Sequence, residues 1–410
     1  MTRETQTADF VVRNARILTL AGEEAPRRGA DMAKLNVMER GDVAILDGDI
    51  LEVGPDLHVR GVHEIDAAGR VLMPGLVDCH THACWAGVRY DELDRLGRGE
   101  SYLDILGSGG GIMASVRAVR AAEVDELAEL TAARFERMRR LGATTIECKS
   151  GYGLSTEAEV KMLTAIGLAA RKARMRIAPT ALIAHAIDKN NPRFIEETIE
   201  ETVHAVAEAF PGICLDAYCE KGAWSLADCR RLFEAGAELG LPFRVHADQF
   251  NDLGMIDLAV EMGGWSVDHL EASTAQGLKK LADSDTMGVM LPVSAFHLND
   301  TYAKGRRFID LGGALAIATN LNPGTGPSPS MPFALSLAVK FNKLSPAEAI
   351  TAGTINAAAV LHLDDEIGSI EVGKRADLLL LSVTDERALV YEVAGDPVDT
   401  VFISGAPIAR

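Results

Sequence analysis

Short apolar runs and amphipathic stretches alternate along the middle of the chain. Runs rich in apolar or β-branched residues lie at 72–79, 144–148, 177–184, 213–218, 243–245, 266–267, 289–293 and 314–318. Helical spacing of apolar residues recurs between most of them, as in Leu127, Leu130, Met138 and Leu141. A strand followed by a helix, repeated about eight times, is typical of a parallel barrel. We therefore expect an α/β protein with a (β/α)8 TIM-like barrel over residues 74–363.

Both ends of the chain have a different pattern. Residues 1–73 contain short apolar runs separated by turn residues, and so do residues 364–410, where strands are expected at 368–372, 376–381, 389–393 and 398–403. Two β-rich ends around a different middle predict one small β-sandwich domain formed from both termini, 1–73 and 364–410.

Charge and composition narrow the functional classes. The chain has 59 acidic and 41 basic residues, a formal net charge of −18, and 48% hydrophobic residues. Such a chain has material for a large core, and its charge disfavours nucleic acid as a partner. No apolar run is long enough for a membrane span, so no membrane partner is expected. The six cysteines form no CxxC pair and indicate reduced thiols in a cytoplasmic protein.

Histidines gather at the predicted strand ends. Barrel enzymes place their chemistry at the carboxyl ends of the strands. His80 and His82 follow the first strand, and His185, His246 and His269 end the third, fifth and sixth. Side chains two apart on a strand point the same way, so both imidazoles of the HxH pair can reach one ion, and imidazole suits Zn²⁺ and iron. The sequence thus predicts a catalytic metal site. His297, after the seventh strand, is left open between a structural and a functional role.

Longer motifs give a resemblance. The segment PGLVDCHTH at 74–82, the barrel pattern and GSIEVGKRADLLLL at 368–381 resemble the amidohydrolase superfamily. Within it the chain is similar to the imidazolonepropionase family of histidine degradation, over nearly its whole length. The motifs that carry this similarity lie at 110–112, 147–154, 184–186, 246–249, 268–271 and 322–325. KSGYGL and NPGT are specific to that family and its near relatives, whereas HxH marks only the superfamily.

The resemblance implies roles for individual residues. One divalent or trivalent metal ion, zinc or iron, would be held by His80, His82, His246 and the residue at position 320. His269, His185 and position 320 would be catalytic. Contacts to a small anionic cyclic-amide substrate would come from Arg89, Tyr152, His185, Gln249, Asn322, Gly324 and Thr325. The implied reaction is hydrolysis of 4-imidazolone-5-propanoate to N-formimino-L-glutamate, and the implied assembly is a homodimer.

Position 320 departs from the family pattern. The family has aspartate where this chain has Asn320. An amide can offer its oxygen to a metal but cannot accept a proton as a base. Three explanations stay open: an engineered replacement that traps a ligand, a native residue in a relative whose proton goes to His185, His269 or Asp248, or a chain that binds without catalysis. The otherwise intact site argues against the third.

Two segments beside the site also differ from the family. Residues 83–88 lack the usual bulky pair after HxH, and residues 294–298 are less aromatic. Both are expected near the substrate ring. A hydantoin- or thiohydantoin-type propionate is therefore the alternative substrate, and a non-catalytic small-ligand-binding relative is the second alternative.

Overall fold

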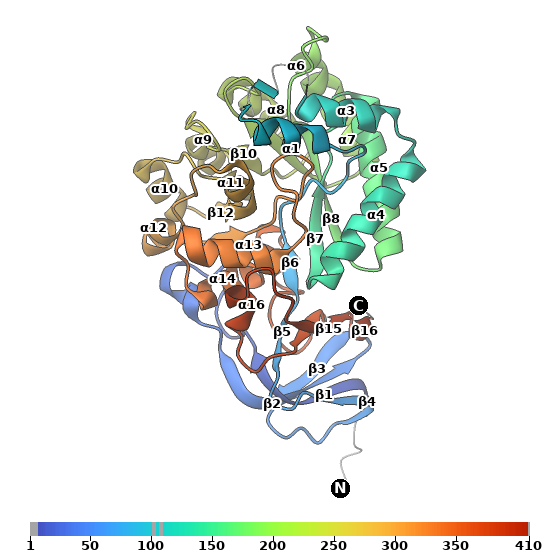
Figure 1. The fold of residues 1–410 in the computed structure, drawn as a ribbon, viewed down its shortest axis with the longest axis vertical. Coiled ribbons are helices and arrows are strands. Elements are labelled where there is room, and N and C mark those ends of the chain that lie inside the picture. The colour runs from blue at the N-terminus through green and yellow to red at the C-terminus, as the bar shows by residue number, and fades with distance from the viewer. Residues whose placement is uncertain (1–6, 101–103, 106–109, 409–410) are drawn as a thin grey trace.

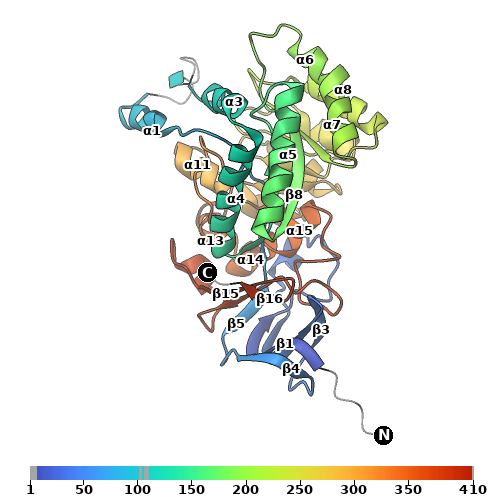
Figure 2. The same ribbon diagram turned by 90° about the vertical axis from the view of Figure 1, so that its right-hand side faces the viewer.

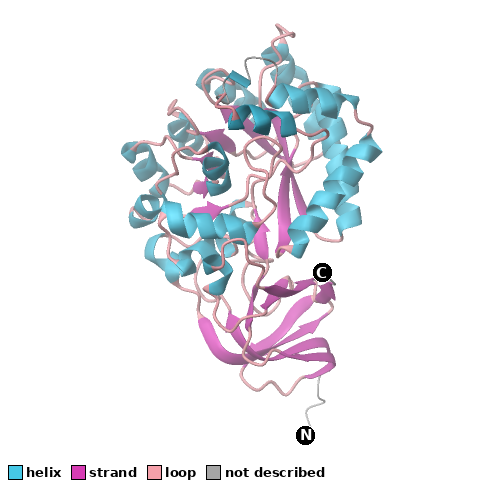
Figure 3. Ribbon diagram, viewed as in Figure 1, coloured by secondary structure: helices cyan, strands magenta, loops and turns pink. Residues whose placement is uncertain are grey.

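Eight parallel strands in the described part of the chain form the predicted barrel (Figures 1 and 3). The computed structural model describes residues 7–100, 104–105 and 110–408. The strand order is β13-β12-β11-β10-β9-β8-β7-β6, so each strand pairs with its neighbour in sequence. The bounds are β6 Leu76–Asp78, β7 Ala143–Lys149, β8 Arg176–Ala184, β9 Cys214–Cys219, β10 Val245–Ala247, β11 Ser266–His269, β12 Met287–Met290 and β13 Leu315–Ile317.

The two edge strands of this sheet meet just beyond their carboxyl ends. Thr81 forms a parallel bridge with Leu321, and the amide of His82 donates to the carbonyl of Leu321 over 2.9 Å. The sheet thereby closes around its own core, and the segments after the first and last strands are brought side by side.

Helices cover the outside of the barrel (Figure 2). Several begin at a serine or threonine whose side chain accepts from the third amide of the helix, as Ser155 does for α5 and Ser225 for α8. Their bounds are α1 Tyr90–Gly97, α3 Ile112–Ala121, α4 Val124–Arg140, α5 Thr156–Ala173, α6 Phe194–Glu197, α7 Val203–Ala209, α8 Leu226–Glu238, α9 Met255–Glu261, α10 Ala275–Ala282, α11 Pro292–Leu298, α12 Gly305–Asp310, α13 Met331–Leu337, α14 Pro346–Ala352, α15 Ile355–Val360 and α16 Ala388–Tyr391. Shorter helical turns lie at Gly29–Ala33, Thr198–Thr202 and Ala338–Asn342.

Strands from both chain ends form the second sheet, as predicted. Its order is β16-β15-β14-β5-β1-β2-β3, with β4 also paired to β1. The bounds are β1 Thr7–Leu18, β2 Val37–Leu46, β3 Asp49–Gly54, β4 Arg60–Asp66, β5 Val71–Pro74, β14 Leu378–Leu381, β15 Val398–Ile403 and β16 Ala406–Ile408. The rings of Phe10 and Phe402 touch edge to face, 5.4 Å between centroids, although their strands are not neighbours. The sheet therefore bends around one apolar core. The division of the chain at residues 74 and 364 stays a prediction.

Several predicted elements are wrong in detail. The run 72–79 is two strands, because the chain passes from the terminal sheet (β5) into the barrel (β6) at Gly75, where a Cβ would overlap Thr144. The run 289–293 ends as a strand at Met290, since Pro292 begins α11.

The terminal domain also differs from the predicted pattern. Residues 389–393 fall largely in helix α16 rather than in a strand, and 368–372 form no strand. The mostly exposed β4 was missed because it has no buried apolar face. No helix in the described ranges is long and apolar enough to cross a membrane.

Candidate metal centre

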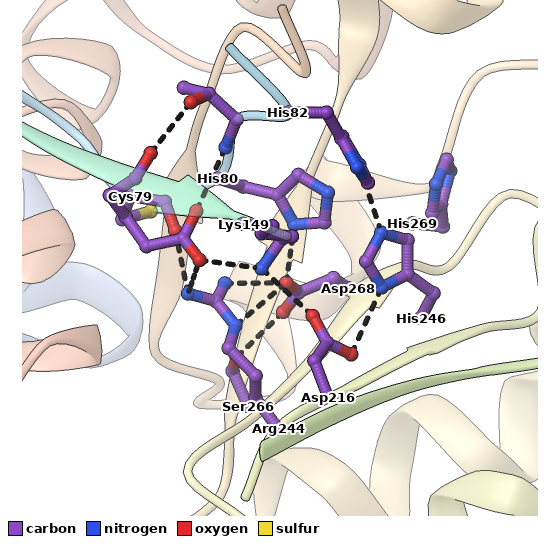
Figure 4. Close-up of polar contacts among 12 residues, drawn as sticks. Cys79, His80, His82, Lys149, Asp216, Arg244, His246, Ser266, Asp268 and His269 are labelled. Carbon is purple, nitrogen blue, oxygen red and sulfur yellow. Dashed lines mark hydrogen bonds and ion pairs between the residues drawn. The ribbon is translucent and has the colours of Figure 1, made fainter. Parts of the chain in front are cut away.

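Three histidines converge at the carboxyl ends of barrel strands. His80 and His82 follow β6, and His246 lies in β10. One nitrogen from each lies within 4.8 Å of the others, and all three side chains are buried. Nε2 of His246 is 3.2 Å from Nε2 of His82. Figure 4 shows the three rings facing one another above a layer of charged side chains.

Buried carboxylates orient two of these rings. Nδ1 of His80 donates to Oδ2 of Asp268 over 2.5 Å, and Nδ1 of His246 donates to Oδ1 of Asp216 over 3.0 Å. A carboxylate only accepts, so each Nδ1 carries the proton and each Nε2 presents a lone pair. Such carboxylate–histidine pairs fix the tautomer of metal ligands.

Two buried cations balance those carboxylates. Lys149 Nζ lies 2.8 Å from Glu147 Oε1 and 2.8 Å from Asp216 Oδ2. Arg244 donates to Asp268 Oδ2 through Nε and Nη2, and to the carbonyl of Cys79 through Nη1 (Figure 4). Burial, together with the positive charge of Lys149, lowers the pKa values of His80 and His246 well below the usual value. Both rings are therefore neutral near pH 7, the form that binds metals.

Asn320 lies next to this group along the backbone. The backbone N–H of Asn320 donates to the carbonyl of His80 over 3.1 Å. This hydrogen bond holds the segment after β13 against the HxH segment. Oδ1 of Asn320 is buried and has no hydrogen-bond partner within the described residues, and the same is true of Nε2 of His80. Buried polar atoms are normally satisfied. Three imidazoles fit a divalent ion and leave room in its coordination for an oxygen ligand, so the donor set suits the metal that the sequence predicts.

His185 and Tyr152 lie on one side of the three histidines. The His185 ring stacks on His82, with centroids 4.9 Å apart and 20° between the planes, and its Nδ1 donates to the carbonyl of Gly151 over 3.0 Å. Burial lowers the pKa of His185 to about 4, so the ring is neutral with Nε2 as an acceptor. The Tyr152 ring is 5.3 Å from that of His185. Glu159 holds this loop by accepting from the amides of Gly151, Gly153 and Leu154.

His269 and Gln249 lie near the other imidazoles. The His269 ring is 5.6 Å from that of His246 and 6.1 Å from that of His80. Nδ1 of His269 lies 3.3 Å from Oε1 of Glu271. Gln249 accepts through Oε1 from the hydroxyl of Tyr218 over 2.8 Å, and the Tyr218 ring contacts the His246 ring.

The NPGT segment forms a compact turn beside Arg89. Oδ1 of Asn322 accepts from the amides of Gly324 and Thr325, while its Nδ2 donates to the carbonyl of Asn320. A Cβ at residue 324 would overlap the guanidinium of Arg89, so glycine allows that close approach. Arg89 also donates to Glu92 over 2.5 Å.

Comparison with known proteins identifies the family to which the chain belongs. A model described as the amidohydrolase family matches residues 71–408. Curated relatives named imidazolonepropionase include one from Herpetosiphon aurantiacus, 39% identical over 98% of each chain. Another, from Deinococcus radiodurans, is 41% identical over 93% of this chain and 96% of its own length.

The chain belongs to the imidazolonepropionase family of amidohydrolases.

Solved structures of other enzymes share the fold at low identity. A zinc-bound adenosine deaminase from Xanthomonas campestris superposes with a TM-score of 0.72 at 19% identity, covering 98% of this chain and 93% of its own. At that identity the likeness supports the barrel alone.

The structure brings together, from distant parts of the chain, residues that the resemblance to imidazolonepropionases singles out. His80, His82 and His246 form one cluster, His185 and His269 contact it, and Asn320 bonds to its backbone. Arg89, Asn322 and Gly324 line one cavity beside it. His297, left open by the sequence, lines the same cavity.

Several residues around the site were missed. Asp216 and Asp268 orient His246 and His80, Arg244 holds Asp268, Glu271 pairs with His269, and Glu159 holds the Tyr152 loop. One feature of the sequence could have indicated some of these residues, namely a charged residue inside an apolar strand, such as Asp216 in β9. Such a residue requires a buried partner but does not reveal which one.

Proposed function

We propose that the chain hydrolyses the cyclic amide of 4-imidazolone-5-propanoate, with water, to N-formimino-L-glutamate in histidine degradation. The observation that carries this proposal is the convergence of three imidazoles, two of which are fixed by buried carboxylates. The chain that holds them is 41% identical, over 93% of its length, to a protein named imidazolonepropionase. A cytoplasmic location and a homodimer stay predictions.

His80, His82, His246 and Oδ1 of Asn320 would hold one metal ion, zinc or iron. Such an ion lowers the pKa of a water molecule to about 7 and polarises the amide carbonyl. The neutral side chain of Asn320 leaves the ion with one negative charge fewer than aspartate would give. We expect weaker metal retention in this chain than in a variant with aspartate there.

Proton handling would fall to the neighbouring histidines, because the Asn320 amide cannot serve as a base. His185 presents an unprotonated Nε2 next to His82, which suits it to accept a hydrogen bond from a ring N–H of the substrate. His269 pairs with Glu271 through Nδ1, so its Nε2 would be the atom that takes a proton from the attacking water and passes it to the leaving nitrogen.

Substrate orientation would depend on the residues around Arg89. Its guanidinium can bind the propionate carboxylate in a bidentate manner. Asn322, Gly324 and Thr325 form the turn beside it, and Tyr152 and Gln249 border the imidazole cluster. The chain has a net charge of −18, so this local positive charge is needed to attract an anionic substrate.

A hydantoin- or thiohydantoin-type propionate is the second candidate substrate. The two segments that differ from the family, 83–88 and 294–298, meet at one cavity beside Arg89, to which they contribute Trp85, Val88 and His297. A change on both walls of one cavity favours a change in what it accepts.

A side-by-side assay tests these proposals. The metal-loaded protein and the N320D variant are supplied with imidazolone propionate and with hydantoin propionate, and ring opening is followed by absorbance and product analysis. Ring opening of the imidazolone supports the first candidate, and exclusive turnover of the hydantoin supports the second. No turnover of either by both proteins would refute hydrolysis and leave a ligand-binding relative.

A further inference from the structure

The cavity beside Arg89 is lined by none of His80, His82 and His246. It has a volume of about 410 Å³ and lies between the segment before α1, helix α4 and the NPGT turn. Its walls include Trp85, Arg89, Arg134, Arg137, His297 and Gly324. A volume of this size accommodates a small organic ligand in addition to the end of a substrate arm.

Arg134 is a largely buried cation that has no acidic partner among the described residues. Its Nη1 donates to the backbone carbonyls of Ala83 and Trp85, and its guanidinium lies 3.4 Å from the centroid of the Trp85 ring. It makes no ion pair with any described carboxylate. Burial lowers its pKa to about 10, so the group is still charged near pH 7. Buried charges are usually paired, and an unpaired one is costly.

Arg137 adds a second charge one helical turn further along α4. It lines the same cavity and is exposed, and residues 7–100, 104–105 and 110–408 offer it no ion pair or hydrogen bond. The acid in the cavity wall, Glu92, is already engaged by Arg89 and by the amide of Gly111. The cavity therefore has an excess of positive charge in a chain whose net charge is −18.

We propose that this cavity is a second anion-binding site, built on Arg134 and Arg137, which takes a small dicarboxylate. One carboxylate binds the guanidinium groups of Arg134 and Arg137, and the other reaches toward Arg89, which lines the same cavity. Arginine matches carboxylate geometry, and residues three apart on a helix present their side chains on one face.

The site has a consequence for the reaction, and that part rests on the proposed function. Hydrolysis of a cyclic amide that carries a propionate arm forms a second carboxylate, so the product is a dicarboxylate while the substrate is a monocarboxylate. A site selective for dicarboxylates next to the substrate anchor would hold product and slow its release. Dicarboxylates of similar length are then inhibitors.

Binding of glutarate to the full-length metal-loaded protein tests the site without any turnover. Trp85 lies under Arg134, so its fluorescence reports occupancy, and calorimetry gives an independent dissociation constant. We expect saturable glutarate binding, with R137Q weakening it about tenfold through loss of one charge-assisted contact. R134K, which keeps the charge but not the planar contact with Trp85, is expected to weaken it as well. R140Q is the matched control, because Arg140 is exposed on the same helix, pairs with Glu136 and does not line the cavity.

The result that overturns the proposal is equally direct. Equal glutarate affinity in R137Q and R140Q, or no saturable binding to the unmodified protein, excludes a site on Arg137. Propionate binding as tightly as glutarate excludes selectivity for dicarboxylates, and phosphate binding more tightly than glutarate assigns the site to a different anion. A protein that binds glutarate but hydrolyses neither cyclic amide keeps this site and loses the proposed function, so the two failures are distinguishable.

Discussion

Replacing Asp216 by asparagine tests how the metal centre is supported. Asp216 accepts from His246 Nδ1 over 3.0 Å and faces Lys149 Nζ at 2.8 Å. An asparagine of the same shape has only one oxygen, so its amide group must face either the imidazole N–H or the ammonium group. One of the two contacts is lost, and His246 loses the negative charge behind it.

The magnitude follows from these contacts. Loss of a carboxylate behind a ligand histidine costs about 10–100-fold in metal affinity, which is about 1.4–2.7 kcal/mol. Lys149 keeps Glu147 at 2.8 Å, so no buried cation is left without a partner and the protein should fold. We expect the free energy of unfolding of the metal-free protein to fall by about 1–3 kcal/mol, the cost of one impaired buried hydrogen bond.

The assay is competition for the metal with a chelator, together with chemical unfolding of the metal-free protein. E159Q is the matched control, because Glu159 is also a buried carboxylate but accepts from loop amides and contacts no ligand histidine. If D216N retains metal as strongly as the unmodified protein and E159Q, the carboxylate does not support the metal and the reasoning is refuted.

Two further predictions concern substrate binding and pH. G324A should displace the Arg89 guanidinium, because the added Cβ would overlap it, and KM should rise about tenfold. The control G167A, which adds a Cβ in open space on α5, should leave KM unchanged. Equal KM values for the two variants would contradict the role given to Arg89. Burial raises the pKa of Glu386, but the hydrogen bond and charge of Arg16 together with a backbone hydrogen bond outweigh burial, so the pKa lies below its usual value. This pair contributes stability above the usual glutamate pKa and loses it as pH falls through the lowered value, so E386Q should cost about 1 kcal/mol in urea unfolding at pH 7 and progressively less as the pH is lowered below the usual glutamate pKa. A cost that persists at the lower pH would show that packing, not charge, explains it.

The sequence predicted the barrel and the clustering of three histidines for the same physical reason. Strand and helix periods alternate in the middle of the chain, and a parallel barrel brings all carboxyl strand ends to one face. His80, His82 and His246 could therefore be placed together although they lie far apart in sequence, and the structure places their nitrogens within 4.8 Å of one another.

The supporting charges could not be predicted in the same way. Asp268 lies inside β11 and accepts from His80, which is 188 positions away in the sequence. It also accepts from Arg244, which directly precedes the neighbouring strand β10. Nothing local in either segment specifies that pairing, because it depends on the order and register of the strands. The same holds for Arg134, which lacks an acidic partner in the described part of the chain, because this is visible only when the surroundings of α4 are known.

Local pattern failed where tertiary context decided. Residues 389–393 carry an apolar run that predicts a strand, yet Ala388–Tyr391 form a short helix that packs against α13. At Gly75 the chain leaves one sheet for another within a continuous apolar run. The spacing of apolar residues does not reveal such a break, because the residues on both sides of it are buried in a sheet.

Metal-dependent ring opening of imidazolone propionate is the most direct measurement of the central claim. The protein is freed of metal with a chelator and reloaded with one equivalent of Zn²⁺ or Fe²⁺, and N-formimino-L-glutamate is quantified for the unmodified chain, N320D and H246A. We predict product only after reloading, a faster reaction in N320D, and neither metal retention nor product in H246A. Product formed equally without metal, or H246A as active as the unmodified chain, would contradict the account.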